Sequence, residues 1–287
     1  ILERAAEVLA REPLEPTLWG AVNGLALLAT GDKKHLPAVR SFARCLATET
    51  DVGDVRRWGT WEIGYRGLFL GEYHLLTKDP DVLPVIERLV LALARGQSLY
   101  GTFGHGFAER AADGGTHGSI PPYGPVNAAG LVANMAIVVG AKCGVVDPEI
   151  EAAIGRAGRF FGYYVDKGSI PYGEHAPWPY HENNGKNSMA AVFFAMQGDR
   201  PVETRYFAKM ATAAYANREY GHTGQGFSYL WSGLGAGAGG AAATAAFFRE
   251  ASWHFDLARR CDGSFAYDGA EQYGGGSTDD GTYAGPS

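Results

Sequence analysis

The stretch from Ser169 to Asn187, SIPYGEHAPWPYHENNGKN, holds an unusual density of side chains that can do chemistry. It places two histidines, two glutamates, a lysine, aromatic rings and amides between two runs with helical periodicity. Long loops of this composition more often serve a site than a fold. Glu182 is our first candidate for a general acid or base, and Glu174 and Asp280 are the candidate second carboxylates that glycoside hydrolysis would need.

The same loops could instead serve a polysaccharide lyase. His181 or His222 would take the proton α to a uronate carboxylate, and Tyr172 or Tyr229 would return it. An amide from Asn183 or Asn184 would stabilise the developing charge. The candidate substrate-binding residues share rings that stack on sugars or polar groups that bond to hydroxyls: His105, Tyr172, His175, Trp178, Asn183, Asn184, Lys186, Asn187, Tyr229 and Trp231.

A purely structural role competes with catalysis at Glu182. Together with Asn184, Glu182 could cap the helix expected to start near Lys186, because free backbone N–H groups at a helix start favour carboxylate and amide oxygens. The two roles are compatible. We therefore carry both as hypotheses.

Metal and cofactor chemistry has little support in the sequence. No HxxxH or HExxH spacing places two histidines on one helix face, so we predict no metal and no cofactor. Cys45, Cys143 and Cys261 are scattered without CxxC spacing, which predicts buried thiols rather than disulfides or a zinc site.

Composition narrows the class of protein. The chain has 287 residues, of which 46% are hydrophobic and 20% charged, with a net charge of -6. No stripe of Lys and Arg suits a phosphate backbone, so nucleic acid is not an expected partner. No segment reaches the roughly 18 uninterrupted apolar residues of a membrane span. Because the chain opens at Ile1 inside a helical pattern, we expect a piece of a longer protein.

Along the whole chain, the spacing of apolar residues predicts helices almost throughout and hardly any strand. Several helices are expected to begin after a turn that holds an aspartate and a proline, because both residues suit a helix start. The turn aspartates are Asp32, Asp79, Asp147 and Asp199. The expected helices are 1–11, 17–30, 36–49, 60–77, 82–96, 126–143, 148–165, 186–198, 202–219, 229–249 and 252–261.

These helices read as repeated hairpins, each an apolar inner helix followed by a more charged outer one. Tight turns alternate with long loops, which predicts a single all-α domain over 1–287: an α/α toroid of about six hairpins with inner and outer helix rings. The long loops would gather on one face, bringing His105, His117, His175, His181, His222 and Trp231 together. A two-domain helical bundle is the structural alternative.

Several motifs resemble an uncharacterised bacterial family, a domain of unknown function in which an α/α toroid follows a PDZ-like domain. They are NGLALLATGD, YRGLFLGEYHLLTKD, GQSLYGTFGHGFA, IPYGEHAPW, HENNGKN, REYGHTGQGFSYLWSGLG and LARRCDGSF. The resemblance implies the toroid, a PDZ-like domain in the same parent chain, and an exported or periplasmic location. It implies no activity.

At the level of fold, such a toroid is similar to six-hairpin glycosidases, polysaccharide lyases and terpenoid cyclases. The loop composition favours a carbohydrate-active enzyme, a glycoside hydrolase or polysaccharide lyase, acting on an oligosaccharide or smaller ligand in the funnel. The alternative is a non-catalytic scaffold module that binds a glycan or peptide. A terpenoid-cyclase-like or zinc-dependent enzyme is a weaker third interpretation, since fold analogy does not decide function.

Overall fold

The computed structural model describes residues 1–109, 112, 118–182, 185–217 and 224–265. These residues are mostly helical and form no strand, only the isolated bridges Ser169–Trp178 and Arg259–Phe265. The all-α prediction is confirmed. Within the described residues, no helix is long and apolar enough to cross a membrane.

The helices pack into two compact units. One holds Leu14–Tyr163 and Gly173–His175, and the other holds Ile1–Pro13, Tyr164–Tyr172 and the chain from Ala176 onward. We call them the α2–α7 unit and the α8–α11 unit. Each is described by itself.

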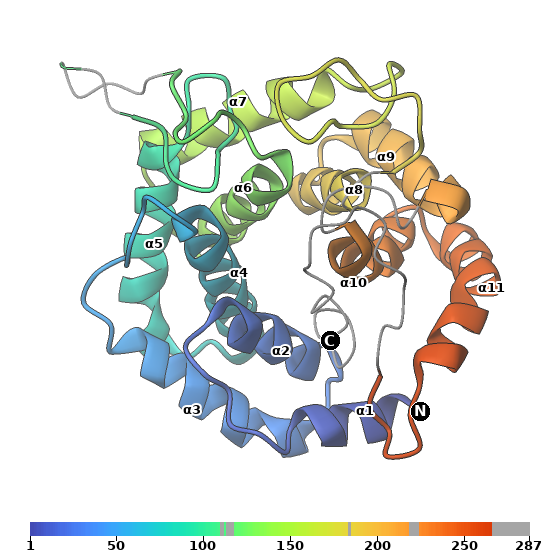
Figure 1. Ribbon diagram of the computed structural model, residues 1–287. Helices are drawn as coiled ribbons and strands as arrows, with labels where there is room; N and C mark the ends of the chain where they lie inside the picture. Colours follow the sequence, from blue (N-terminus) through green and yellow to red (C-terminus); the bar gives the residue numbers. More distant parts are fainter. Residues whose placement is uncertain (110–111, 113–117, 183–184, 218–223, 266–287) are drawn as a thin grey trace. The chain divides into compact units, whose positions relative to one another are not determined.

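The α2–α7 unit has two layers of helices (Figure 1). In one layer α4 lies between α2 and α6, and in the other α5 lies between α3 and α7. The bounds are α2 Leu18–Ala29, α3 Leu36–Ala47, α4 Gly59–Thr77, α5 Leu83–Gly96, α6 Asn127–Lys142 and α7 Pro148–Gly162.

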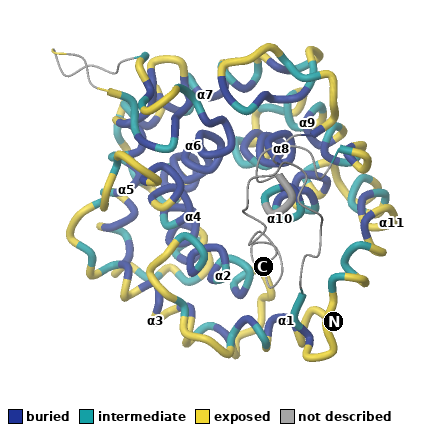
Figure 2. Tube along the Cα trace, in the orientation of Figure 1, coloured by how far each residue is buried: buried dark blue, intermediate teal, exposed yellow. Residues whose placement is uncertain are grey.

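Composition explains which helices lie inside this unit. α6 is built from small and apolar residues on every side and is buried from Asn127 to Gly140 (Figure 2). α5 buries only the stripe that includes Val85, Leu89 and Leu93, as an amphipathic outer helix should. The predicted inner and outer character of these helices is therefore seen in their burial.

Glycines on α4 allow α6 to come close. A Cβ at Gly71 would lie 2.1 Å from Val139 Cγ1, and one at Gly64 would lie 3.0 Å from Val132 Cγ1. Real Cβ atoms essentially never come as close as the contact at Gly71, so a side chain there would force Val139 or the helix to shift, whereas at Gly64 the contact would be tight.

The α8–α11 unit is built in the same manner. α8 packs on both α9 and α10, and α11 packs on α9 and α10. The bounds are α1 Leu2–Leu9, α8 Lys186–Gln197, α9 Pro201–Ala213, α10 Gly224–Gly237 and α11 Ala241–Ala258.

The last helices differ from the prediction. The expected helix 229–249 is divided, because Gly240 adopts a φ of 89° and the chain turns between α10 and α11. Positive φ is accessible to glycine at little cost, so the glycine-rich run ends a helix instead of continuing it. The expected helix 202–219 likewise ends at Ala213.

The turn aspartates were predicted correctly in three of four hairpins. Asp32, Asp79 and Asp147 each accept a backbone N–H two residues further on, at 2.9, 3.1 and 2.8 Å. Asp199 does not follow: Arg200 is the N-cap of α9, and Asp199 instead pairs with the Arg200 guanidinium at 3.8 Å.

The cysteines are less buried than expected. Cys45 and Cys261 are exposed, and only Cys143 is partly buried. Its thiol lies 3.5 Å from the Gly71 carbonyl oxygen. Burial raises the pKa of Cys143 to about 11, and the nearby charge of Glu72 adds to this effect. All three are free thiols.

Candidate functional site

The loop that carries His105 is fastened to the start of α4 in the α2–α7 unit. The His105 carbonyl accepts from the Thr60 backbone N–H at 3.0 Å, and the Phe107 N–H donates to the Val55 carbonyl at 3.0 Å. Between them, a Cβ at Gly106 would lie 2.1 Å from the Arg56 carbonyl oxygen. The His105 loop and the 55–58 segment therefore lie side by side.

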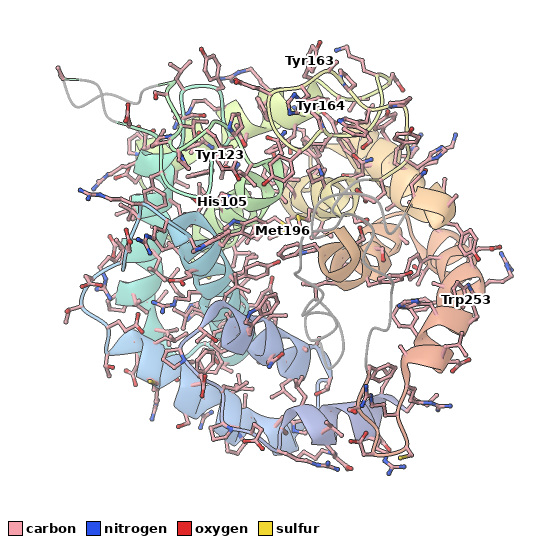
Figure 3. The ribbon with its side chains drawn as sticks, in the orientation of Figure 1. His105, Tyr123, Tyr163, Tyr164, Met196 and Trp253 are labelled. Carbon is pink, nitrogen blue, oxygen red and sulfur yellow. The ribbon has the colours of Figure 1, made fainter. Side chains whose placement is uncertain are left out.

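His105 is hydrogen-bonded to two aromatic side chains, Trp61 and Tyr123; Figure 3 labels His105 and Tyr123. The Trp61 indole N–H donates to His105 Nδ1 at 2.9 Å, and His105 Nε2 lies 2.6 Å from the Tyr123 hydroxyl oxygen. Because an indole N–H can only donate, Nδ1 must be the acceptor, and the neutral imidazole carries its proton on Nε2. His105 therefore donates to the oxygen of Tyr123.

The hydrogen-bonded group Trp61–His105–Tyr123 is buried at Trp61 and exposed to solvent at Tyr123. Trp61 is 6% exposed, whereas Tyr123 is 59% exposed and Trp58 is 58% exposed. The Trp58 ring lies 4.3 Å from the His105 ring, centroid to centroid, at an angle of 64°. An exposed indole beside a polarised phenol can stack on the apolar face of a ring and bond to its polar groups.

A buried amide network holds the loop between α5 and α6. Asn127 accepts from the Thr102 hydroxyl at 3.1 Å and donates to the Gly173 carbonyl at 3.0 Å. Asn134 donates to the Gly101 carbonyl at 3.1 Å and accepts from Gln97 at 2.7 Å. These bonds fix the backbone directly before His105.

The α8–α11 unit contains most of the Ser169–Asn187 segment, and its end is anchored on α8. Asn187 Nδ2 donates to the His181 carbonyl at 2.6 Å, and Asn187 Oδ1 accepts from the Ile170 N–H at 3.1 Å. Ser169 and Trp178 exchange backbone hydrogen bonds of 2.9 and 3.0 Å. Asn187 thus ties both ends of the loop to the first turn of the helix.

Glu182 is wholly buried and caps α8. One oxygen accepts from the Asn187 backbone N–H at 3.0 Å. The other accepts from the backbone N–H and the hydroxyl of Ser188, at 2.9 and 2.8 Å. The predicted capping by Glu182 is therefore present, and its catalytic role stays a prediction.

Lys186 is also wholly buried, in the first turn of α8. Burial lowers its pKa to about 7, and the charge of Glu182 opposes this shift. An amine with a lowered pKa can exchange a proton near neutral pH. The same residue equally serves as the partner of a buried carboxylate.

The remaining predicted residues of this unit lie in different surroundings. Trp231 is 6% exposed and belongs to the core, whereas His181 is exposed. Tyr229 stacks on His254 with ring centroids 3.8 Å apart. Tyr172 and Trp178 are half-buried, and the Trp178 ring lies 5.9 Å from that of Tyr180.

Glu174 and His175 belong to the α2–α7 unit and are exposed. A Cβ at Gly124, the neighbour of Tyr123, would lie 3.6 Å from Glu174 Oε1. A carboxylate therefore lies next to the Tyr123 segment. His117, Asn183, Asn184, His222 and Asp280 lie outside the described residues.

Metal ligands do not gather in the described part of the chain, where no three side chains of His, Cys, Asp and Glu come close enough to hold an ion.

His105 was among the residues predicted from the sequence, whereas Trp58, Trp61 and Tyr123 were not. A signal was present in the WGTW motif, because tryptophans three residues apart at a helix start lie on one face. Tyr123 offered no comparable signal, since only the folded loop brings it to His105.

The fold and sites described define an all-helical protein of packed hairpins with an exposed aromatic–histidine cluster. Over residues 1–287 the chain matches the family described as "Domain of unknown function (DUF6288)". The chain belongs to this family, as the motifs predicted. No curated protein and no solved structure matches it.

Proposed function

We propose that this protein is a carbohydrate-active enzyme that holds sugar on the surface formed by Trp58, His105 and Tyr123. The observation that carries the proposal is the hydrogen-bonded chain from Trp61 through His105 to Tyr123, which ends beside the exposed Trp58. Aromatic faces with a few oriented polar groups suit pyranose rings.

Among carbohydrate reactions, lyase chemistry suits this cluster best. Tyr123 as phenolate would take the proton α to a uronate carboxylate, and the His105 N–H would stabilise the phenolate. The electron pair of the broken C–H bond forms a carbon–carbon double bond as the glycosidic C–O bond breaks. Tyr123 then gives its proton to the oxygen of the leaving sugar. The cleaved polysaccharide therefore has one new end with an unsaturated uronate and one new end with a free hydroxyl.

Cations near Trp58 would pair with the carboxylate of an acidic sugar, against the nearby negative charges of Glu174 and Asp54. Two exposed cations, Arg56 and Arg57, directly precede Trp58. Asn183 and Asn184, the amides predicted to stabilise the developing charge, lie outside the described residues, as does His222. The pairing of His181 or His222 with Tyr172 or Tyr229 stays a prediction.

Hydrolysis is less well supported because it needs two carboxylates free to act. Both oxygens of Glu182 already accept hydrogen bonds from Asn187 and Ser188. Glu174 is exposed, and Asp280 is outside the described residues.

A non-catalytic glycan-binding module is the second candidate. It is favoured by the exposure of Trp58 and Tyr123, since open aromatic surfaces bind ligands without enclosing them. In that case the PDZ-like domain proposed for the parent chain would supply contact with a partner.

We also propose that the hairpins belong to an α/α toroid. The support is the two-layered packing of the α2–α7 unit and the inner character of α4 and α6. A terpenoid-cyclase-like or zinc enzyme has no comparable observation in its favour.

The test is a panel of polysaccharides with and without uronic acids, followed by ultraviolet absorbance of unsaturated ends. We expect absorbance to grow with uronate polymers only. Binding of the polymers without any product would support the binding module, and neither binding nor product would overturn the carbohydrate assignment.

A further inference from the structure

A second, separate site lies in the α8–α11 unit, where three arginines line one pocket. The cavity has a volume of about 420 Å³ and is lined by Ile1, Arg4, Arg259, Arg260, Cys261 and Gly263. Arg4 comes from α1, whereas Arg259 and Arg260 directly follow α11. Only folding brings these cations together.

A tight turn holds the two later arginines in place. The Arg260 N–H donates to the Ser264 carbonyl at 2.8 Å, and the Gly263 N–H donates to the Arg260 carbonyl at 3.1 Å. Asp262 Oδ1 closes the turn by accepting from the Ser264 backbone N–H at 2.9 Å and its hydroxyl at 2.7 Å. The carboxylate is thereby partly engaged within the turn.

Gly263 makes room for Arg4. Its φ is 94°, and a Cβ there would lie 2.5 Å from Arg4 Cγ and 3.0 Å from Arg4 Nε. Any other residue at this position would push the Arg4 side chain aside. The glycine therefore allows the α1 arginine to lie directly over the turn.

All three arginines are exposed, and in the part of the chain that the structure describes the nearest carboxylate is that of Asp262, whose pKa is lowered by its hydrogen bonds to Ser264 and by the charges of Arg11 and Arg260. Three cations with one carboxylate beside them leave a net positive charge around the cavity, and an anion bound there would reduce the repulsion between the guanidiniums. Guanidinium groups match the paired oxygens of sulfate, phosphate and carboxylate.

We propose that this pocket binds an oxyanion group, sulfate or phosphate, carried on a small molecule of about the size of a sugar. A cavity of about 420 Å³ falls within the roughly 300–1,000 Å³ of typical small-molecule sites and is larger than an inorganic ion needs. The site is independent of the Trp58–His105–Tyr123 surface, and its ligand is recognised by charge and not by stacking.

Calorimetry with glucose 6-sulfate, glucose 6-phosphate and glucose tests the proposal at low and at high salt. We expect at least one of the two esters to bind and glucose not to bind. Added salt should weaken the binding of the ester. The stronger of the two esters identifies the oxyanion. If neither binds at low salt, the proposal is overturned.

Variants then locate the site. Arg259→Gln should weaken ester binding about tenfold, since a charge-assisted hydrogen bond is lost. Gly263→Ala should weaken it too without changing any charge, because Arg4 is displaced. The control Arg249→Gln removes an exposed arginine of α11 outside the pocket and should leave binding unchanged.

Equal effects of Arg259→Gln and Arg249→Gln would mean that net charge alone attracts the ester, which contradicts a built site. Helix content and melting temperature are measured for each variant. If Gly263→Ala does not fold, Arg4→Gln carries the same test, with a loss of binding expected.

Discussion

The buried Glu182 shows how one side chain can have both a structural and a chemical interpretation. Its two oxygens accept three hydrogen bonds from the start of α8. In Glu182→Gln an amide group would face donors, and Lys186 would lose its charged partner. We expect a loss of about 3 kcal/mol in the free energy of unfolding, measured by denaturant titration.

The matched control is Glu174→Gln in the same segment. Glu174 is exposed, so its replacement should change the free energy of unfolding by less than about 0.5 kcal/mol. If both variants were equally stable, the capping account of Glu182 would be wrong.

Lys186 should give stability a dependence on pH. Its pKa in the folded chain is about 7, against an ordinary value of 10.5, so the unfolded chain binds the additional proton between these values. The free energy of unfolding should therefore rise with pH across this window, by up to about 1.4 kcal/mol per unit. Below pH 7 both states are protonated and this contribution no longer changes.

Denaturant titrations of Lys186→Met at pH 7, 8 and 9 check the slope. In Lys186→Met the free energy of unfolding should no longer show the increase with pH that Lys186 contributes. The control Lys209→Met, at an exposed position of α9, should still show this increase. An unchanged slope in Lys186→Met would show that Lys186 stays protonated in the folded chain.

For single residues, the sequence predicted which side chains belong to a site better than it predicted which side chains contact each other. The chemical character of the 169–187 loop identified Glu182, Lys186 and Asn187, all of which are buried around the start of α8. The partners of His105 could not be found in the same way, because Trp61 and Tyr123 are 44 and 18 residues away.

Helix packing in the α8–α11 unit depends on a glycine of α10. A Cβ at Gly235 would lie 2.6 Å from the Ser188 Cα, whereas one at Gly237 would meet nothing within 4 Å. We expect Gly235→Ala to lower the free energy of unfolding by about 1–3 kcal/mol, since α8 and α10 must separate. Gly237→Ala in the same helix should be neutral or slightly stabilising.

Thermal or denaturant unfolding of the two variants measures this difference. Equal stabilities would contradict the close contact between α8 and α10.

The elements themselves were largely predictable. Periodicity located α2 to α8 within a few residues, because each presents a regular apolar pattern. It failed at the α10–α11 turn, where alanines and glycines carry little periodic signal and the conformation of Gly240 decides the break. Asp199 likewise shows that a turn aspartate suits a cap without ensuring one.

For the whole molecule, the sequence predicted an all-α chain and its family, and both are confirmed. The toroid and the carbohydrate reaction stay proposals, because both depend on which loops lie close together in the folded chain. The carbohydrate proposal can be tested at the Trp58–His105–Tyr123 surface of the α2–α7 unit.

The most direct test compares wild type with Tyr123→Phe on a uronate polymer that the wild type cleaves. We expect the variant to bind the polymer as before but to lower kcat at least about 100-fold, because the proton acceptor is gone. Trp58→Ala should instead raise KM about tenfold by removing a stacking face. A Tyr123→Phe variant that still forms unsaturated product at the wild-type rate would contradict the account.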